Sequence, residues 1–455
     1  MSKEEVLMTD LTARAVTLVA QGGLASAELS ESHRHWAEAN GFNGQSGRLL
    51  ALPADDGDVA GYLFGIGAEA DRQPLIVGAA AAQLAPGRYR LAGQIDDPTL
   101  AALAFRLGGY RFTRYRKLDD APELELPENA DAAEVDRLVE AAFIARDLIN
   151  TPANDLGPDA LEEYARAQAA RDDMQVRVTR GDDLVGAGFP MIHAVGRAAG
   201  QAPRLIDLTW GSEDAPKVTL VGKGVTFDTG GLDIKPAAGM VLMKKDMGGA
   251  ANVLGLAHAI VRAKLNVRLR VLLPVVENAI SANAFRPSDI LMSRKGITVE
   301  IGNTDAEGRL ILADALALAC EEDPALVIDM ATLTGAARAA LGPDLPPLYT
   351  GDDTLAAALM AAGTPHGDPL WHMPLWTPYE AMLASKVADI NNAGAGGFAG
   401  SVTAALFLRR FVEKPENWVH LDIYGWSPDA KPGRSAGGTD QGIRAVYQVL
   451  KQRYA

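Results

Sequence analysis

The feature that most constrains the fold is an alternation of strand-like and helix-like segments along the larger, C-terminal part of the chain. Residues 267–273 alternate apolar and polar side chains with the two-residue period of a strand, and the apolar runs 326–328 and 419–423 are typical of buried strands. Apolar residues recur at helical spacing over 250–261 and 310–320. Strands separated by helices predict an α/β layered domain whose ligand site lies at loops beyond the strand ends.

An acidic, proline-bracketed segment at 121–128 (APELELPE) is suited to a linker. Asp131 is a plausible N-cap after it, and apolar residues then follow helical spacing until Thr151-Pro152 ends the pattern. We therefore expect a smaller N-terminal α/β domain at 1–130, with a role in oligomerisation or regulation, and a larger α/β domain at 131–455. The larger domain should begin with a connecting helix at 131–150 and contain a mixed, mainly parallel central sheet flanked by helices.

Charge and cysteine content exclude several classes of protein. The chain has 43 Lys+Arg against 58 Asp+Glu, a net charge of −15, whereas nonspecific binding of a phosphate backbone needs clustered cations. Its single cysteine can form neither an internal disulfide nor a cysteine-built metal site. No stretch approaches the roughly 18 apolar residues of a membrane span, and residues 1–5 (MSKEE) do not resemble the start of a secretory signal. We expect a soluble, cytoplasmic protein that binds neither membranes nor nucleic acid.

The densest polar segment runs from Lys223 to Asp246. The apolar run 218–221 predicts a strand that delivers Lys223 near its end, and glycines around Lys223 and after Asp228 allow close approach of a ligand. A phosphate-binding loop would place Ser or Thr after the lysine and then a helix. Gly224 follows Lys223 instead, and no helical pattern comes next, so the sequence does not favour that alternative.

A second polar segment places Asp305 and Glu307 between a strand signal at 298–301 and the helical pattern at 310–320. We expect both residues in the turn, where their spacing does not force the side chains apart, so both could face one site. The alternative is that Asp305 merely caps the helix and Glu307 favours its dipole.

Together the two segments supply acids and cations in unusual density, namely Asp228, Asp246, Asp305 and Glu307 beside Lys223, Lys235 and Arg309. Carboxylates that converge on one point repel strongly unless divalent cations neutralise them. Oxygen-rich ligand sets suit two metals about 3.5–4 Å apart that activate water or polarise a substrate oxygen. The alternative is a solvated, charged surface.

Several motifs resemble one known family. NTDAEGRL at 303–310 is similar to the signature octapeptide of the cytosolic leucyl aminopeptidases, and GKGVTFD, IKP and KDMGGAA at 222–228, 234–236 and 245–251 are similar to the other metal-binding segment of that family. The resemblance extends through ARDLINTP at 145–152, ATLTGA at 331–336 and ADINN at 388–392, so it covers about residues 140 to 455. In the N-terminal part it is carried chiefly by GYRF at 109–112.

The resemblance implies a catalytic domain at 131–455 that removes N-terminal residues, preferably Leu or another apolar residue, from peptides by attack of a water bridging two metal ions. The positions that match the family's metal ligands are Lys223, Asp228, Asp246, Asp305 and Glu307, with Asp228 and Glu307 expected to bridge. A lysine donates a lone pair only as the neutral amine, so the neighbouring ion must hold its pKa down.

Other positions match the family's catalytic pair and substrate pocket. By resemblance, Lys235 polarises the scissile carbonyl, and Arg309 holds a bicarbonate that acts as general base. Met243, Thr332 and Gly335 match positions that line the side-chain pocket, and Leu333 matches a backbone contact to substrate. An apolar wall containing methionine suits aliphatic side chains.

The resemblance also implies two divalent ions per subunit, Mn or Zn first and Mg or Co as alternatives, and a homohexamer. Two other functions are alternatives to the aminopeptidase. A catalytically silent relative used as a binding or DNA-architectural protein would keep the fold but lose ligands, whereas all seven key positions are intact here. A dinuclear phosphoesterase normally recruits His or Asn ligands, which these segments do not offer.

Overall fold

The computed structural model describes residues 13–455, so residues 1–5, expected not to form a secretory signal, lie outside the described range. Contacts divide the chain into two compact units. The first holds the described residues up to Val139 together with Asp429–Ala436, and the second holds Glu140–Pro428 with Gly437–Ala455. The division falls inside α4 (Ala132–Asn150), whose first turn is capped by the Asp131 carboxylate, which accepts from Glu134 N at 3.0 Å.

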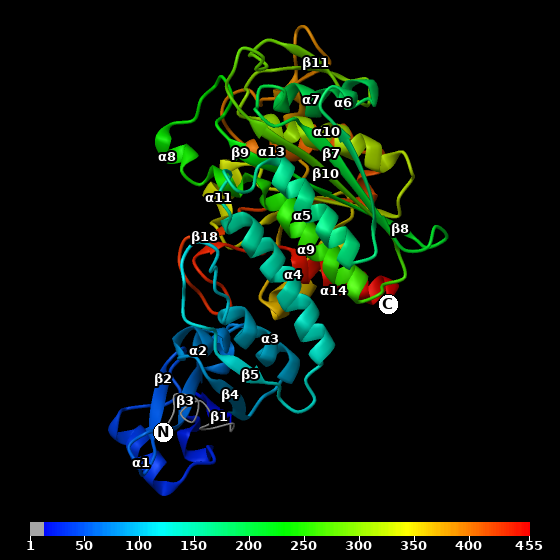
Figure 1. Ribbon diagram of the computed structural model, residues 1–455. Coiled ribbons are helices and arrows are strands. Elements are labelled where there is room, and N and C mark those ends of the chain that lie inside the picture. Colours follow the sequence, from blue (N-terminus) through cyan, green and yellow to red (C-terminus); the bar gives the residue numbers. More distant parts are fainter. Residues whose placement is uncertain (1–12) are drawn as a thin grey trace, which may run out of the picture. The chain divides into compact units, whose positions relative to one another are not determined.

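The first unit, whose residues from 13 to 139 run from blue to cyan in Figure 1, contains a five-stranded sheet in the order β2-β3-β1-β4-β5. Its strands are parallel except β2, which runs antiparallel to β3. The strands are β1 (Arg14–Ala20), β2 (Leu49–Pro53), β3 (Val59–Gly67), β4 (Arg88–Gly93) and β5 (Glu123–Glu125). The helical segments are η2 (Gly23–Ser26), α1 (Glu31–Ala39), η3 (Glu69–Asp71), α2 (Gly78–Gln83) and α3 (Pro98–Gly108).

The second unit is built on a nine-stranded sheet in the order β15-β14-β17-β13-β8-β10-β7-β6, with β9 pairing β10. Strands β17, β13, β8, β10 and β9 run parallel to one another, whereas β14 pairs antiparallel with β17, β7 with β10, and β6 with β7. The strands are β6 (Gln175–Arg180), β7 (Arg204–Trp210), β8 (Lys217–Gly222), β9 (Gly224–Asp228), β10 (Arg268–Asn278), β13 (Leu326–Ala331), β14 (Pro347–Thr350), β15 (Trp371–His372) and β17 (Trp418–Asp422). The predicted α/β class with a mixed, mainly parallel sheet is confirmed.

Helices and smaller strands surround this sheet (Figure 1). The helices are α5 (Pro158–Arg171), α6 (Asp183–Gly186), α7 (Pro190–Gly196), α8 (Ala237–Met240), α9 (Gly248–Arg262), α10 (Glu307–Cys320), α11 (Gly335–Leu341), α12 (Asp353–Gly363), α13 (Gly400–Arg409) and α14 (Ile443–Tyr454), with the 3-10 turns η4 (Met243–Met247), η5 (Thr364–His366), η6 (Thr377–Leu383) and η7 (Pro415–Asn417). The remaining strands are β11 (Ile290–Met292), β12 (Thr298–Glu300), β16 (Ile390–Asn391), β18 (Trp426–Ser427) and β19 (Gly437–Gly438).

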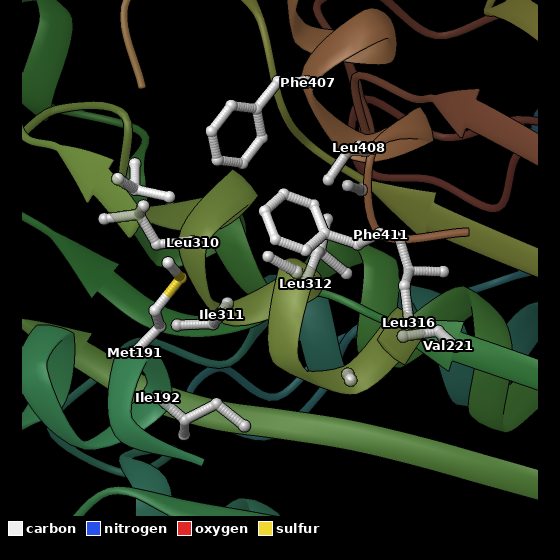
Figure 2. Close-up of a cluster of buried hydrophobic side chains, with 14 of the residues drawn as sticks. Met191, Ile192, Val221, Leu310, Ile311, Leu312, Leu316, Phe407, Leu408 and Phe411 are labelled. Atoms are coloured by element: carbon white, nitrogen blue, oxygen red, sulfur yellow. The ribbon is translucent and has the colours of Figure 1, made fainter. Parts of the chain in front are cut away.

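A continuous apolar cluster fixes the position of α10. Figure 2 shows Ile311 of α10 facing Met191 of α7 on one side. On the other side, Leu312 lies beside two phenylalanine rings, one within α13 and one just after it. Those rings, Phe407 and Phe411, lie 5.2 Å apart between centroids. Because α10 is packed on both sides, its first turn is held rigidly, and Glu307 begins that turn.

None of the helices described between residues 13 and 455 combines the length and the apolar composition that crossing a bilayer requires.

Candidate metal centre

The side chains predicted from the sequence gather at the carboxyl edge of the parallel strands. Lys223 directly follows β8, and Asp228 ends β9. The backbone of Lys223 is tied to the neighbouring strand, because its N–H donates to Met330 O at 3.0 Å. Strand β9, not a helix, follows Lys223, so the phosphate-loop alternative is excluded.

Lys223 is enclosed by carboxylates. Its Nζ lies 2.7 Å from Asp246 Oδ2 and 3.0 Å from Glu307 Oε1, and it donates to Thr332 O at 2.9 Å. A Cβ at Gly308 would lie only 2.5 Å from Lys223 Cε, so the glycine leaves the space that this side chain fills. Because Gly308 has no side chain, the Lys223 side chain can pack against the start of α10 and reach the acidic cluster.

Lys235 makes the second cationic contact. Its Nζ lies 2.8 Å from Asp228 Oδ2 and is also paired with Asp305. The other oxygen of Asp228 accepts from Gly230 N and from Asn278 Nδ2, each at 2.8 Å. These bonds fix the orientation of the Asp228 carboxylate, so that its Oδ2 faces the cluster.

The cluster has the donors and the charge deficit of a cation site. Oxygens of Asp228, Asp305 and Glu307 lie within 4.8 Å of one another. Among the described residues, ion pairs join these four carboxylates to two lysines, Lys223 and Lys235, which leaves 4 − 2 = 2 negative charges uncompensated by these pairs. Glu307 Oε2 is buried and has no hydrogen-bond partner in the part of the chain that the structure describes. Since a buried carboxylate oxygen without a partner is costly, this donor set fits divalent cations.

The crowding of acids perturbs their pKa values. Burial raises the pKa of Asp228 to about 6 and that of Glu307 to about 7, and repulsion from neighbouring carboxylates adds to each shift. Burial alone would lower the pKa of the Lys223 ammonium, but Asp246 and Glu307 raise it above its usual range. In the absence of ions the lysine is therefore a charged counter-ion of the cluster.

The simpler alternatives account for these acids only in part. The N-cap of α10 is Ala306, so Asp305 does not cap the helix. Glu307 is the first residue of α10 rather than part of the turn, so its charge does lie where it favours the helix dipole. The surface alternative fails because Asp228, Asp246 and Glu307 are 2%, 3% and 1% exposed.

Arg309 lies in the first turn of α10. Its Nη1 donates to Asn392 O at 2.6 Å, and its guanidinium lies 6.0 Å from the centre of the Phe407 ring. Burial lowers the pKa of the guanidinium to about 10, so it remains a cation at neutral pH. Its Nε is buried without a hydrogen-bond partner among residues 13–455. The guanidinium thus has the charge and a spare donor to hold a small anion.

Of the expected pocket residues, Thr332 contacts the acidic cluster directly. Met243 begins η4, the turn that also carries Asp246. Thr332 Oγ1 donates to the backbone and side-chain oxygens of Asp246, each at 2.9 Å. A Cβ at Gly335 would meet only an Arg338 nitrogen at 3.9 Å, so this glycine borders open space.

Asp422 holds the segment that carries Leu333 and was not identified from the sequence. Its Oδ1 accepts from Leu333 N and Thr334 N, each at 3.0 Å, and its Oδ2 accepts from Thr334 Oγ1 at 2.6 Å. Asn278, which holds Asp228, was missed as well. Both are polar residues at the carboxyl end of apolar strands, β17 and β10, and that signal could have identified them.

Comparison with known proteins places the chain in a family. The model of the cytosol aminopeptidase family catalytic domain matches residues 143–447, and the model of the M17 aminopeptidase N-terminal domain matches residues 24–127. A protein named probable cytosol aminopeptidase, from Roseiflexus castenholzii, is 44% identical over 367 residues, which cover 76% of this chain and 74% of the relative.

Solved structures agree over nearly the whole length. The crystal structure of cytosol aminopeptidase from Coxiella burnetii matches with a TM-score of 0.92 at 43% identity and covers 98% of each chain. The bottromycin maturation enzyme BotP in complex with Mn matches with a TM-score of 0.89 at 33% identity, covering 97% of this chain and 100% of that one. The family resemblance of the sequence motifs is confirmed: the chain belongs to the cytosol aminopeptidase family, M17, a family of metal-dependent peptidases, and carries both its N-terminal and its catalytic domain.

Proposed function

We propose that this protein removes the N-terminal residue, preferably leucine or another apolar residue, from peptides with two divalent metal ions. The observation that carries the proposal is the convergence of four carboxylates on two lysines, with a buried Glu307 oxygen left unpaired among residues 13–455. The proposed ligands are Lys223, Asp228, Asp246, Asp305 and Glu307, with Asp228 and Glu307 as bridges.

When bound, the two ions would supply an activated water between them and would polarise the scissile carbonyl. The oxygen-rich donor set accepts Mn, Zn, Mg or Co, and we place Mn or Zn first. Mn is supported by the relative BotP, whose structure is a complex with Mn. Lys223 is protonated in the ion-free cluster, so it must release a proton to become a ligand, and metal affinity should rise with pH.

Lys235 is the proposed electrophilic residue. Burial alone would lower the pKa of its ammonium, but Asp228 and Asp305 raise it above its usual range, so the group stays charged. Held by these two carboxylates, the ammonium can donate to the carbonyl oxygen of a substrate and stabilise the negative charge that develops there.

Arg309 is the proposed holder of the general base. Its cationic guanidinium, with a buried Nε that lacks a partner among the described residues, would bind a bicarbonate ion. Bicarbonate would supply a proton acceptor toward the attacking water. Arg309 itself orients the anion and keeps its negative charge in place.

The substrate's free amino group would bind one ion, which restricts cleavage to the first residue of a peptide. Met243 and Thr332 would line the pocket for its side chain, and the open space at Gly335 leaves room for it. Because the Leu333 N–H already donates to Asp422, the backbone contact of Leu333 to substrate would fall to its carbonyl oxygen.

One set of assays tests the proposal. Leucine p-nitroanilide, a phosphodiester analogue and duplex DNA are offered to chelated protein and to protein reloaded with Mn or Zn. We expect amide hydrolysis that only the metal restores. Phosphodiester cleavage, or salt-sensitive DNA binding without amide hydrolysis, would refute it.

We further propose a cytoplasmic location and assembly as a homohexamer. The names of the relatives support the location. The hexamer follows from the family resemblance of the sequence, and light scattering on the purified protein would measure it.

A further inference from the structure

The first unit has a cavity of its own at the carboxyl edge of its parallel strands. From β1 the chain passes by way of β2 to β3, which pairs with β1 on one side, and then crosses to β4, which pairs with β1 on the other side. At such a reversal of strand order the following loops diverge and leave a crevice where ligands bind. Here the crevice has a volume of about 690 Å³ and is lined by the ends of the three strands and the loops after them. These strands are labelled in the blue part of Figure 1.

The lining carries both signs of charge. Glu28, Glu69 and Asp96 face the cavity together with Arg72, an excess of 3 − 1 = 2 negative charges. Arg72 Nη1 lies 3.2 Å from Asp96 Oδ2, while Gln94 Nε2 donates to Asp96 Oδ1 at 2.8 Å. A single contact of 3.2 Å does not saturate a guanidinium, which has five N–H donors. The cavity therefore offers carboxylates for an ammonium group and a cation for a carboxylate.

A second, apolar compartment adjoins this polar one. It has a volume of about 150 Å³ and shares Leu18, Ile66, Arg72, Gln94 and Asp96 with the larger cavity. Its remaining wall is largely aliphatic, with Pro74, Ile76, Val77 and Leu100. The ion pair of Arg72 and Asp96 thus stands at the border between a polar and an apolar space.

We propose that this cavity binds a small zwitterion with an aliphatic side chain, an α-amino acid or a dipeptide. The ammonium group would lie against Glu28 and Glu69, the carboxylate against Arg72, and the side chain in the apolar compartment. The ligand belongs to the product class of the proposed aminopeptidase, and in this respect the inference rests on the proposed function. The binding chemistry itself depends only on the residues of the first unit.

Equilibrium dialysis of the chelated, full-length protein with L-leucine tests the site. Chelation removes the ions to which an amino group would bind in the second unit. We expect saturable binding that Gly23→Leu and Arg72→Gln each weaken by about tenfold or more. Gly23 lines the cavity, and a Cβ there would meet only Val19 and Ala20 atoms at 3.8 Å, so a larger side chain can occupy the space.

Matched controls separate binding from misfolding. Gly200→Leu places the same side chain where a Cβ meets nothing within 4 Å, outside the cavity, and should bind leucine as the unchanged protein does. If circular dichroism shows that Gly23→Leu does not fold, Arg72→Gln decides. Isocaproate, which lacks the ammonium group, and isoamylamine, which lacks the carboxylate, should each bind about tenfold more weakly than leucine.

No binding at about 10 mM leucine, or equal affinity in the unchanged protein and in folded Arg72→Gln, would overturn the inference. Peptide hydrolysis by the metal-loaded protein is measured in parallel. A protein that hydrolyses peptides without binding leucine after chelation refutes the second site alone. A protein that binds leucine at this cavity and hydrolyses no peptide refutes the proposed function alone.

Discussion

Replacing Glu307 by glutamine should change stability and activity in opposite directions. Its carboxylate is buried, and burial together with repulsion from Asp228 raises its pKa from 4.5 to about 7. At about 1.4 kcal/mol for each factor of ten, ionised Glu307 destabilises the metal-free protein by roughly 3 kcal/mol. Glutamine keeps the shape and removes the charge. The metal-free Glu307→Gln variant should therefore be more stable than the unchanged protein by a similar amount.

The sign of the pH dependence follows from the raised pKa. Below about pH 4.5 the carboxyl is protonated in both the folded and the unfolded state, so the difference between the two proteins should vanish. The difference grows as the pH rises from about 4.5, where the carboxyl ionises in the unfolded chain, to the folded pKa of about 7, and should be complete above it. An unfolding entropy of about 2 cal/mol/K per residue makes the gain worth roughly 5 °C in Tm for the larger unit.

The same substitution removes a proposed bridge between the ions. We expect Mn to raise the Tm of the unchanged protein and not that of Glu307→Gln, and kcat on leucine p-nitroanilide to fall by a factor of a thousand or more, about 4 kcal/mol. Glu321→Gln, at the other end of α10 and outside the cluster, is the matched control and should change neither property. A Glu307→Gln variant that keeps more than about a tenth of the original kcat would contradict this prediction. So would a chelated Glu307→Gln variant that is no more stable than the chelated, unchanged protein at pH 8.

Three further perturbations test separate parts of the structure. Asp422→Ala removes the acceptor for Leu333 N, Thr334 N and Thr334 Oγ1, so it should raise KM for peptides about tenfold and lower the free energy of unfolding by roughly 2–3 kcal/mol. Michaelis–Menten kinetics and urea titration measure the two effects. An unchanged KM would contradict the role of Asp422 in holding the segment that carries Leu333. Gly308→Ala places a Cβ 2.5 Å from Lys223 Cε, so Lys223 should be displaced and Mn affinity should fall about tenfold. Dialysis followed by mass spectrometry measures the Mn content, with Gly186→Ala as the control. Full Mn occupancy of the Gly308→Ala variant would count against Lys223 as a ligand. Burial alone would raise the pKa of Glu162, but hydrogen bonds from Arg180, Arg166 and Arg204 lower it to about 2, so Glu162→Gln should lose stability at pH 7. That loss should shrink as the pH falls from about 4.5 to about 2, because the unchanged protein then loses the same stabilisation, and a pH-independent difference in urea titrations would contradict it.

Local patterns in the sequence predicted the elements that carry the site. The apolar runs at 218–221, 326–328 and 419–423 are the buried strands β8, β13 and β17, and the periodic segments at 250–261 and 310–320 are α9 and α10. These predictions succeed because buried parallel strands and core-facing helices have long, regular apolar patterns.

Features that depend on tertiary contacts were not predictable in this way. The position of Asp422 and Asn278 at the carboxyl ends of β17 and β10 marks them only as candidates for a site, and the packed structure shows that one holds Leu333 and the other holds Asp228. The helical pattern at 310–320 predicts a later start for α10 than the observed one at Glu307. The first turn of a helix is stabilised by its surroundings, so helix ends are poorly encoded in the local sequence. The contacts that place Asp429–Ala436 with the first unit join segments far apart in the chain, so no local pattern reveals them.

The measurement that tests the metal centre most directly is anomalous diffraction at the Mn edge from crystals of the Mn-loaded protein. We expect two peaks about 3.5–4 Å apart. The residues that contact them should be Lys223, Asp228, Asp246, Asp305 and Glu307, with Glu307 Oε2, unpaired among the described residues, now bound. A single peak, or ions bound elsewhere while Lys223 and Lys235 keep their ion pairs with the cluster, would contradict it.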